Sequence, residues 1–276
     1  MIEPTPRGAP LRAEQDVARA GWVLDALGTL GCFDGIVPPR FEAAVRILHP
    51  SGRDPCVRSR EVAEREGTDL HPLAQWNPLV GEHLGECSAP RLGLLPLDEL
   101  TLIAEALAAH TATPGDCLAV LWARFGTLTG GSATVLSRSG GSDWLPEWRS
   151  DTRPTGWEHP EIAAAGTVGP PGRDGPLLPL DVWALEDTGW ARVSGFADAS
   201  GLSTRTPLAL WPEDRAWYLA SEVDVDSTLV GGSRALLDDL LLLSRTGRIE
   251  ALLLPLEVDL TSTGDGVNLR LRGRGD

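Results

Sequence analysis

Residues 206–255 read TPLALWPEDRAWYLASEVDVDSTLVGGSRALLDDLLLLSRTGRIEALLLP. This stretch contains two apolar, β-favouring runs, residues 208–211 and 216–225, separated by Pro-Glu-Asp-Arg at 212–215. A proline followed by acidic turn-forming residues between two such runs predicts a β-hairpin. It is the longest stretch in which every part fits one structural unit, so we expect the rest of the chain to be organised around it.

The second run alternates with a period of two, which predicts a strand with two distinct faces. Trp217, Leu219, Val223 and Val225 fall on one face, and Tyr218 and Ala220 begin the other. Glu222, Asp224 and Asp226 continue that second face. The pattern therefore predicts a strand that is apolar at its start and carries three carboxylates on one side at its end.

A helix and a further strand are predicted after this acidic end. Gly231 and Gly232 are expected to end a loop, and Ser233 is placed to cap a helix that begins at Arg234. Leucines then recur at helical spacing, with aspartates between them. Gly247 is expected to end the helix, and residues 249–254 read as a buried strand.

Similar patterns predict the elements outside this stretch. Helices are expected at 13–30, at 60–66 with Ser59 as cap and Gly67 as stop, and at 97–109. Strands are expected at 41–48, where residues 42–46 also fit a helix, and at 117–122, 177–184 and 190–195. The fold class predicted is α+β, with a mixed or mainly antiparallel sheet and three to four helices. The chain is long enough for two subdomains, 1–128 and 177–276, joined by a Gly/Pro/Trp-rich segment, 129–176.

Composition limits the class of partner. The 276 residues carry a formal charge of −15, which disfavours nucleic acid and anionic membrane surfaces and favours a basic protein partner or a divalent cation. The 42% hydrophobic content and ten tryptophans indicate a packed core. The four cysteines are dispersed and form no Cys-x-x-Cys pair, which indicates reduced thiols. The N-terminus is polar and no long apolar run occurs, so we expect a soluble cytoplasmic protein.

The acidic strand end is the main candidate site. Glu222, Asp224 and Asp226, with the hydroxyls of Ser227 and Thr228, have the composition of a hard-cation site for Mg²⁺ or Mn²⁺. The alternative is a solvated strand end that needs no cofactor, with Arg215 or Arg234 as the counter-charge.

Three weaker patterns also occur in the chain. His49, His71, His83 and Cys87 lack the paired spacing of a zinc site, so structural histidines are expected. The Gly-Gly-Ser sequences at 130–132 and 140–142 have no following helical pattern and are expected in flexible loops. Trp144, Trp148 and Trp157 are expected to pack at the edge of the core, or alternatively to form an aromatic ligand loop.

Residues 224–229, DVDSTL, resemble the first motif of haloacid dehalogenase-type phosphatases. In that family one aspartate is the nucleophile and the next is the acid/base, and Mg²⁺ screens the phosphate, so the resemblance implies phosphoester hydrolysis at Asp224 and Asp226. The similarity covers six residues, and the chain contains no lysine to match the one that follows in the family.

A longer resemblance is to an uncharacterised family of actinobacterial proteins. The segment WPEDRAWYLASEVDVDSTLVGGSRALLDDLL is similar to the C-terminal end of that family, FEAAVRILHP (41–50) and HPLAQW (71–76) to its N-terminal region, and HTATP (110–114) with Leu121-Trp122 to its middle. This resemblance spans most of the chain except about 130–205, and it implies a shared fold unit rather than an activity.

Three functions from different classes follow. The first is a non-catalytic interaction or regulatory protein that engages a basic protein partner through its acidic surface. The second is a metal-dependent hydrolase of a phosphorylated substrate that uses Glu222, Asp224 and Asp226. A small-molecule binder that uses the tryptophan-rich segment is a third.

Overall fold

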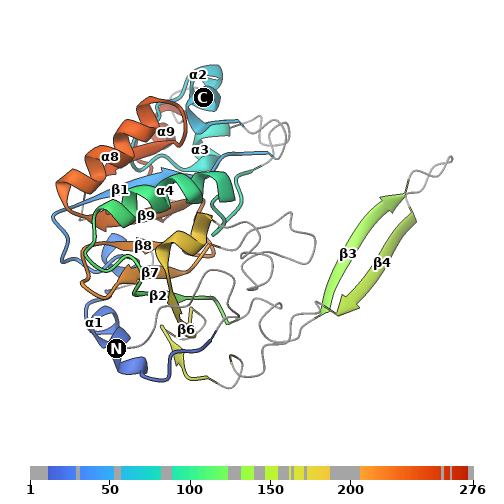
Figure 1. The fold of residues 1–276 in the computed structure, drawn as a ribbon. Helices are drawn as coiled ribbons and strands as arrows, with labels where there is room; N and C mark the ends of the chain where they lie inside the picture. Colours follow the sequence, from blue (N-terminus) through green and yellow to red (C-terminus); the bar gives the residue numbers. More distant parts are fainter. Residues whose placement is uncertain are drawn as a thin grey trace.

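The computed structural model shows an α+β protein built on one large antiparallel sheet (Figure 1). It describes residues 12–28, 32–52, 57–81, 89–123, 132–139, 147–154, 162, 165–170, 173–186, 206–255, 258–261 and 263–272. Among these residues, no helix is long and apolar enough to cross a membrane.

Within the described part, the main sheet contains eight strands in the order β10-β1-β9-β8-β7-β2-β6-β5, and each neighbouring pair is antiparallel. The strands are β1 (Ala43–Leu48), β2 (Cys117–Val120), β5 (Thr167–Val168), β6 (Gly175–Leu180), β7 (Ala209–Pro212), β8 (Tyr218–Ala220), β9 (Ser227–Gly232) and β10 (Ala251–Leu254). The predicted α+β class with a mainly antiparallel sheet is confirmed.

The described residues form more helices than predicted, and the one expected at the N-terminus is shorter. The α-helices are α1 (Gly21–Leu24), α2 (Ser59–Glu66), α3 (Trp76–Val80), α4 (Leu97–Ala109), α8 (Arg234–Arg245) and α9 (Asn268–Arg272), and the 3₁₀ turns are η1 (Val17–Ala20), η2 (Phe33–Gly35) and η4 (Val182–Glu186). The helix predicted over 13–30 is reduced to η1 and α1. The number exceeds three to four because α1, α3 and α9 are about one turn each and have no long apolar stripe in the sequence.

The two faces of the sheet bury separate cores. Trp217 and Leu219 pack with α4 and α8 on one face, while Tyr218 and Ala220 pack with the N-terminal turns on the other. This confirms the predicted alternation at the start of the second run. The indole N–H of Trp217 donates to the Leu107 carbonyl (2.8 Å) and ties α4 to β8. Helices α4 and α8 lie side by side across the same face (Figure 1).

The predicted subdomains contribute strands to the same sheet. β1, from the segment 1–128, lies between β10 and β9, and β2 lies between β7 and β6, so strands from the two segments alternate. In the connecting segment 129–176, the hairpin of β3 (Ser132–Ser139) and β4 (Glu147–Pro154) forms a separate two-stranded sheet (Figure 1). Most of the Gly-Gly-Ser residues at 130–132 and 140–142 lie outside the described residues.

A carboxylate from a distant segment caps α2. The backbone N–H groups of Ser59 and Arg60 donate to the Glu250 carboxylate at 2.8 and 2.9 Å. Ser59 is therefore the first helical residue rather than the predicted cap, and Glu250 satisfies the free N–H groups of the first turn. Gly67 ends the helix in a left-handed conformation (φ 65°), as predicted.

A buried acid near this cap makes a pH-dependent contribution to stability. Glu99 on α4 is 3% exposed and pairs with Arg58 at 2.7 Å. Burial raises the pKa of the Glu99 carboxyl to about 7, against the opposing effect of Arg58. Since the folded-state pKa exceeds the usual value of 4.5, the folded state binds the proton more tightly, and stability is lost as pH rises from about 4.5 to about 7.

Glu99→Gln is expected to remove this pH dependence. Between about pH 5 and pH 8, the free energy of unfolding of the variant should rise relative to that of the wild type by up to about 3 kcal/mol. Urea denaturation at both pH values measures the difference. Glu105→Gln, at an exposed position of the same helix, is the matched control and should leave the pH profile unchanged. Parallel profiles for wild type and Glu99→Gln would contradict the assignment.

Candidate functional site

The three predicted acids lie in a turn rather than on a strand. β8 ends at Ala220, and residues 221–226 form the connection to β9. The prediction of a strand through Val225 was wrong because the alternating pattern continues across a turn whose N–H groups bond locally, as Val225 N–H does to the Glu222 carbonyl (3.0 Å). Gly93 packs against this turn and donates its N–H to the Val225 carbonyl (2.9 Å).

Each of the three carboxylates pairs with an arginine. Arg173 contacts Glu222 (2.5 Å) and also pairs with Asp224, while Arg46 pairs with Asp226 at 2.8 Å. The acids are therefore divided between two guanidinium groups instead of converging on one point. Among the described residues, no group of three or more His, Cys, Asp or Glu side chains could hold a metal ion. The arrangement does not favour the Mg²⁺ or Mn²⁺ site, nor the hydrolase that depends on it.

Arg46 is the centre of a buried polar network. It is 1% exposed and donates to the Ser227 hydroxyl (2.9 Å), the carbonyls of Pro72 (3.0 Å) and Ala74 (2.8 Å), and Asp226 (2.8 Å). These bonds join β1, the segment before α3 and the β8–β9 turn. A buried charge of this kind is tolerated because its donors are satisfied.

Thr228 and His49 have the spacing of a nucleophile and its base, but they are closed to solvent. His49 Nδ1 donates to the Arg91 carbonyl (2.7 Å), so Nε2 accepts from the Thr228 hydroxyl (2.9 Å), which in turn accepts from Ser221 (2.9 Å). Burial lowers the pKa of His49 to about 4, which keeps the imidazole neutral. Thr228 is 0% exposed, so no substrate reaches its hydroxyl.

The remaining predicted site residues are not brought together. His71 is bonded to the buried Asp265 at 2.8 Å, which agrees with the structural role expected for it. His83, Cys87, Trp144 and Trp157 lie outside the described residues. Trp148 is on β4, opposite Arg138 in the hairpin.

A groove of about 1030 Å³ runs along the outside of the acidic turn. One wall carries Glu222, Asp224 and Asp226, and Asp224 is the most exposed of them, with 70% of its side chain accessible. The apolar lining comes mainly from α3, from residues 89–92 and from the C-terminal segment, and Val225 of the turn adds to it; these residues include Trp76, Pro78, Pro90, Leu92, Leu260 and Leu269. The groove thus joins acidic and apolar surface.

Sequence reasoning missed the partners of the acids. The sequence suggests Arg215 or Arg234 as the counter-charge, whereas the structure uses Arg46 and Arg173. Arg215 instead lies over the Trp22 ring, 5.2 Å from its centroid. One of these partners could have been suspected from the sequence. Arg46 is a single arginine within the apolar run Ala43–Leu48, and a charge buried there requires a partner.

Comparisons of the chain with models of protein families, with curated proteins and with solved structures find no match.

Proposed function

We propose that this chain is a non-catalytic binding protein whose groove holds a basic, partly apolar segment of a protein partner. The observation that carries the proposal is the groove itself, in which three carboxylates and Arg173 stand beside an apolar floor. Arginine and lysine side chains of a partner complement the remaining negative charge, above all at the exposed Asp224, while its apolar residues cover the floor.

Exposure of apolar side chains beside the groove supports a protein partner. Leu92 is 51% exposed and Leu269 is 45% exposed, and both line the groove. Large exposed apolar side chains surrounded by a polar rim are typical of protein interaction sites. The formal charge of −15 would also accelerate the encounter with a basic partner.

The closed hydroxyl–imidazole pair supports a non-catalytic role. Thr228 and His49 have suitable spacing for nucleophilic chemistry but are 0% and 1% exposed. Their hydrogen bonds instead fix the start of β9 against residues 49 and 91. The buried polar groups then hold the acidic turn in place as the wall of the groove.

Asp224→Arg is expected to weaken binding of a basic peptide by about tenfold or more, because it reverses the charge of the most exposed acid in the groove. The probe is a fluorescein-labelled peptide that alternates arginine and leucine, and binding is measured by fluorescence anisotropy at about 0.15 M salt. Wild type should bind it with a Kd on the order of 10 µM.

Controls separate the groove from the overall negative charge. Asp238→Arg makes the same charge change at an exposed position of α8, outside the groove lining, and should change the Kd less than about twofold. Leu92→Asp should weaken binding despite adding a negative charge, because it breaks the apolar floor. Equal losses in Asp224→Arg and Asp238→Arg, or equal binding of a glutamate–leucine peptide, would refute the proposal.

A further inference from the structure

A second pocket, of about 410 Å³, lies between the first turn of α2, the last turns of α8 and the start of β10. Its described lining consists of Arg60, Leu241, Ser244, Arg245 and Ala251, and none of these residues lines the acidic groove. Small-ligand sites have volumes of about 300–1,000 Å³, so the pocket is large enough for a small molecule. In a chain with a formal charge of −15, two arginines without a carboxylate in this lining reverse the charge locally.

Hydrogen bonds at the start of β10 bring the two arginines to the same pocket. The Arg60 N–H donates to the Glu250 carboxylate (2.9 Å), which is 4% exposed and does not line the pocket. The Ser244 hydroxyl accepts from the Ala251 N–H (3.0 Å) and donates to the Ala251 carbonyl (3.2 Å). Since Arg245 follows Ser244 and Ala251 follows Glu250, these bonds hold the backbones of both arginines near one strand start. A ligand would therefore have to order the two side chains but not the backbone.

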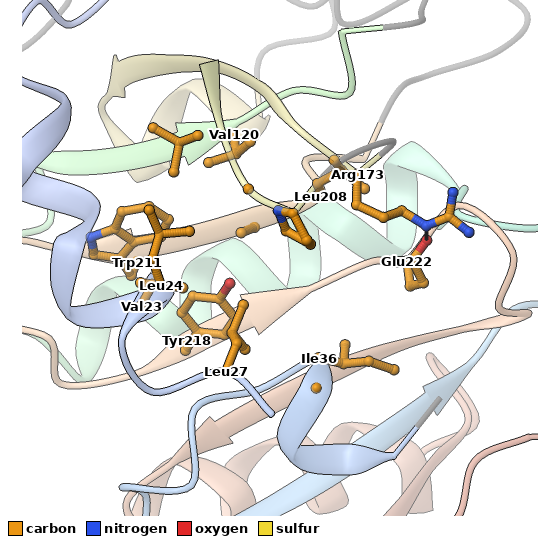
Figure 2. Close-up of a pocket in the computed structure, with 15 residues that line it drawn as sticks. Val23, Leu24, Leu27, Ile36, Val120, Arg173, Leu208, Trp211, Tyr218 and Glu222 are labelled. Atoms are coloured by element: carbon orange, nitrogen blue, oxygen red, sulfur yellow. Dashed lines mark ion pairs between the residues drawn. The ribbon is translucent and has the colours of Figure 1, made fainter. Parts of the chain in front are cut away.

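Both guanidinium groups are available to a ligand. Arg60 and Arg245 are exposed, and within the described part of the chain neither side chain makes an ion pair or a hydrogen bond. The arginines of the candidate site differ in this respect, as Figure 2 shows for Arg173, whose guanidinium is paired with Glu222. Positive charge that has no partner within a pocket favours the binding of an anion.

We infer that this pocket binds a small phosphomonoester, whose phosphoryl group lies between the guanidinium groups of Arg60 and Arg245. A phosphomonoester carries a charge of about −1.5 to −2 at pH 7, which two arginines neutralise. Its three terminal oxygens can accept from two guanidinium groups that come from different helices, whereas the two oxygens of a monocarboxylate match one guanidinium. Leu241 offers apolar surface to the organic part of the ester. This inference does not depend on the protein partner proposed for the acidic groove.

The test is isothermal titration calorimetry of the full chain with phenyl phosphate at about 0.02 M salt, where exposed charges are weakly screened. We expect binding of one molecule per chain with a Kd on the order of 1 mM. Benzoate, the monocarboxylate with the same ring, should bind about tenfold more weakly or less. A capped Gly-phosphoserine-Gly peptide tests a protein as the source of the phosphoryl group, and it should bind more weakly than phenyl phosphate because more rotatable bonds are ordered.

Variants of the two arginines test the location. Arg60→Gln and Arg245→Gln should each weaken the binding of phenyl phosphate by about tenfold, and the double variant should abolish it. Arg60→Lys keeps the charge but loses the fork of donors, so it should weaken binding severalfold. Arg234→Gln removes the same charge at an exposed position of α8 outside the described lining, and it should change the Kd less than about twofold.

Each outcome supports the site or overturns it. Binding of phenyl phosphate that both single glutamine variants weaken and Arg234→Gln spares supports it. Absence of binding at about 10 mM, benzoate binding as tight as that of phenyl phosphate, or an equal loss in Arg234→Gln overturns it. Tighter binding of the phosphoserine peptide would assign the phosphoryl group to a protein and overturn the small ester. Melting curves establish that each variant is folded before it is titrated.

Discussion

Arg46→Met is expected to lower the free energy of unfolding by about 3–5 kcal/mol, the range found when one partner of a buried ion pair is removed. Methionine fills similar space but donates no hydrogen bond. Four acceptors would then lose their donor: the Asp226 carboxylate, the Ser227 hydroxyl and the carbonyls of Pro72 and Ala74. Urea denaturation followed by circular dichroism measures the loss.

Two further variants show whether the loss arises from the network. Arg46→Lys keeps the charge but cannot reproduce the fork of donors, so a substantial part of the loss should remain. Arg245→Met, at an exposed position near the end of α8, should cost less than about 0.5 kcal/mol. If Arg46→Met is no more destabilising than Arg245→Met, the network does not stabilise the fold.

Gly175→Ala is expected to cost about 3 kcal/mol or more, because there is no space for a methyl group at this position. A Cβ atom on Gly175 would lie 1.5 Å from the Leu121 carbonyl oxygen and 2.6 Å from its carbon. Both atoms belong to backbone, so the ends of β2 and β6 would have to separate. The nearby bond from the Ala123 N–H to the Asp174 carbonyl (3.0 Å) would then be lost or lengthened.

Gly21→Ala is the matched control for this substitution. Gly21 begins α1, and a Cβ atom there meets nothing within 4 Å. Since alanine is the better helix former, this variant should be as stable as wild type or slightly more stable. Thermal melting of the two variants gives the comparison, and a wild-type melting temperature for Gly175→Ala would contradict the close approach of β2 and β6.

The sequence predicted correctly those helices and turns that are determined by residues close together in the chain. Residues 97–109 form α4 within the predicted limits, because Leu100, Ile103 and Leu107 mark one stripe. Ser233 caps α8 by accepting from the Leu236 N–H (3.3 Å), and the turn after Pro212 places Arg215 in a left-handed conformation (φ 56°). Each signal lies within a few residues of the structure that it determines.

β9 was missed because its glycines suggested a loop. The predicted loop end at Gly231 and Gly232 is the end of a central strand that pairs with both β1 and β8. A Cβ on Gly231 would lie 2.8 Å from the Phe41 ring, and one on Gly232 would lie 2.8 Å from Leu236. These glycines allow other side chains to pack closely against the strand. Their role depends on those neighbours, so the glycines themselves do not indicate it in the sequence.

The candidate site was only partly predictable for a similar reason. Glu222, Asp224 and Asp226 stand out in the sequence, and the structure places all three along one groove. Their ion-pair partners come from other segments, with Arg46 lying 180 residues from Asp226. Which arginine meets which carboxylate is set by the sheet topology, which no local pattern contains.

The position of β1 between β9 and β10 has a consequence for synthesis. This strand pairs with β9 on one edge and β10 on the other, and Arg46 precedes Ser227 by 181 residues. At about 5–20 residues per second, a ribosome leaves both edges of β1 bare for roughly 10–40 seconds. Bare strand edges associate with other chains. The sheet around β1 therefore forms only after β9 and β10 have been synthesised, and a nascent chain stalled before β10 is a natural client for chaperones.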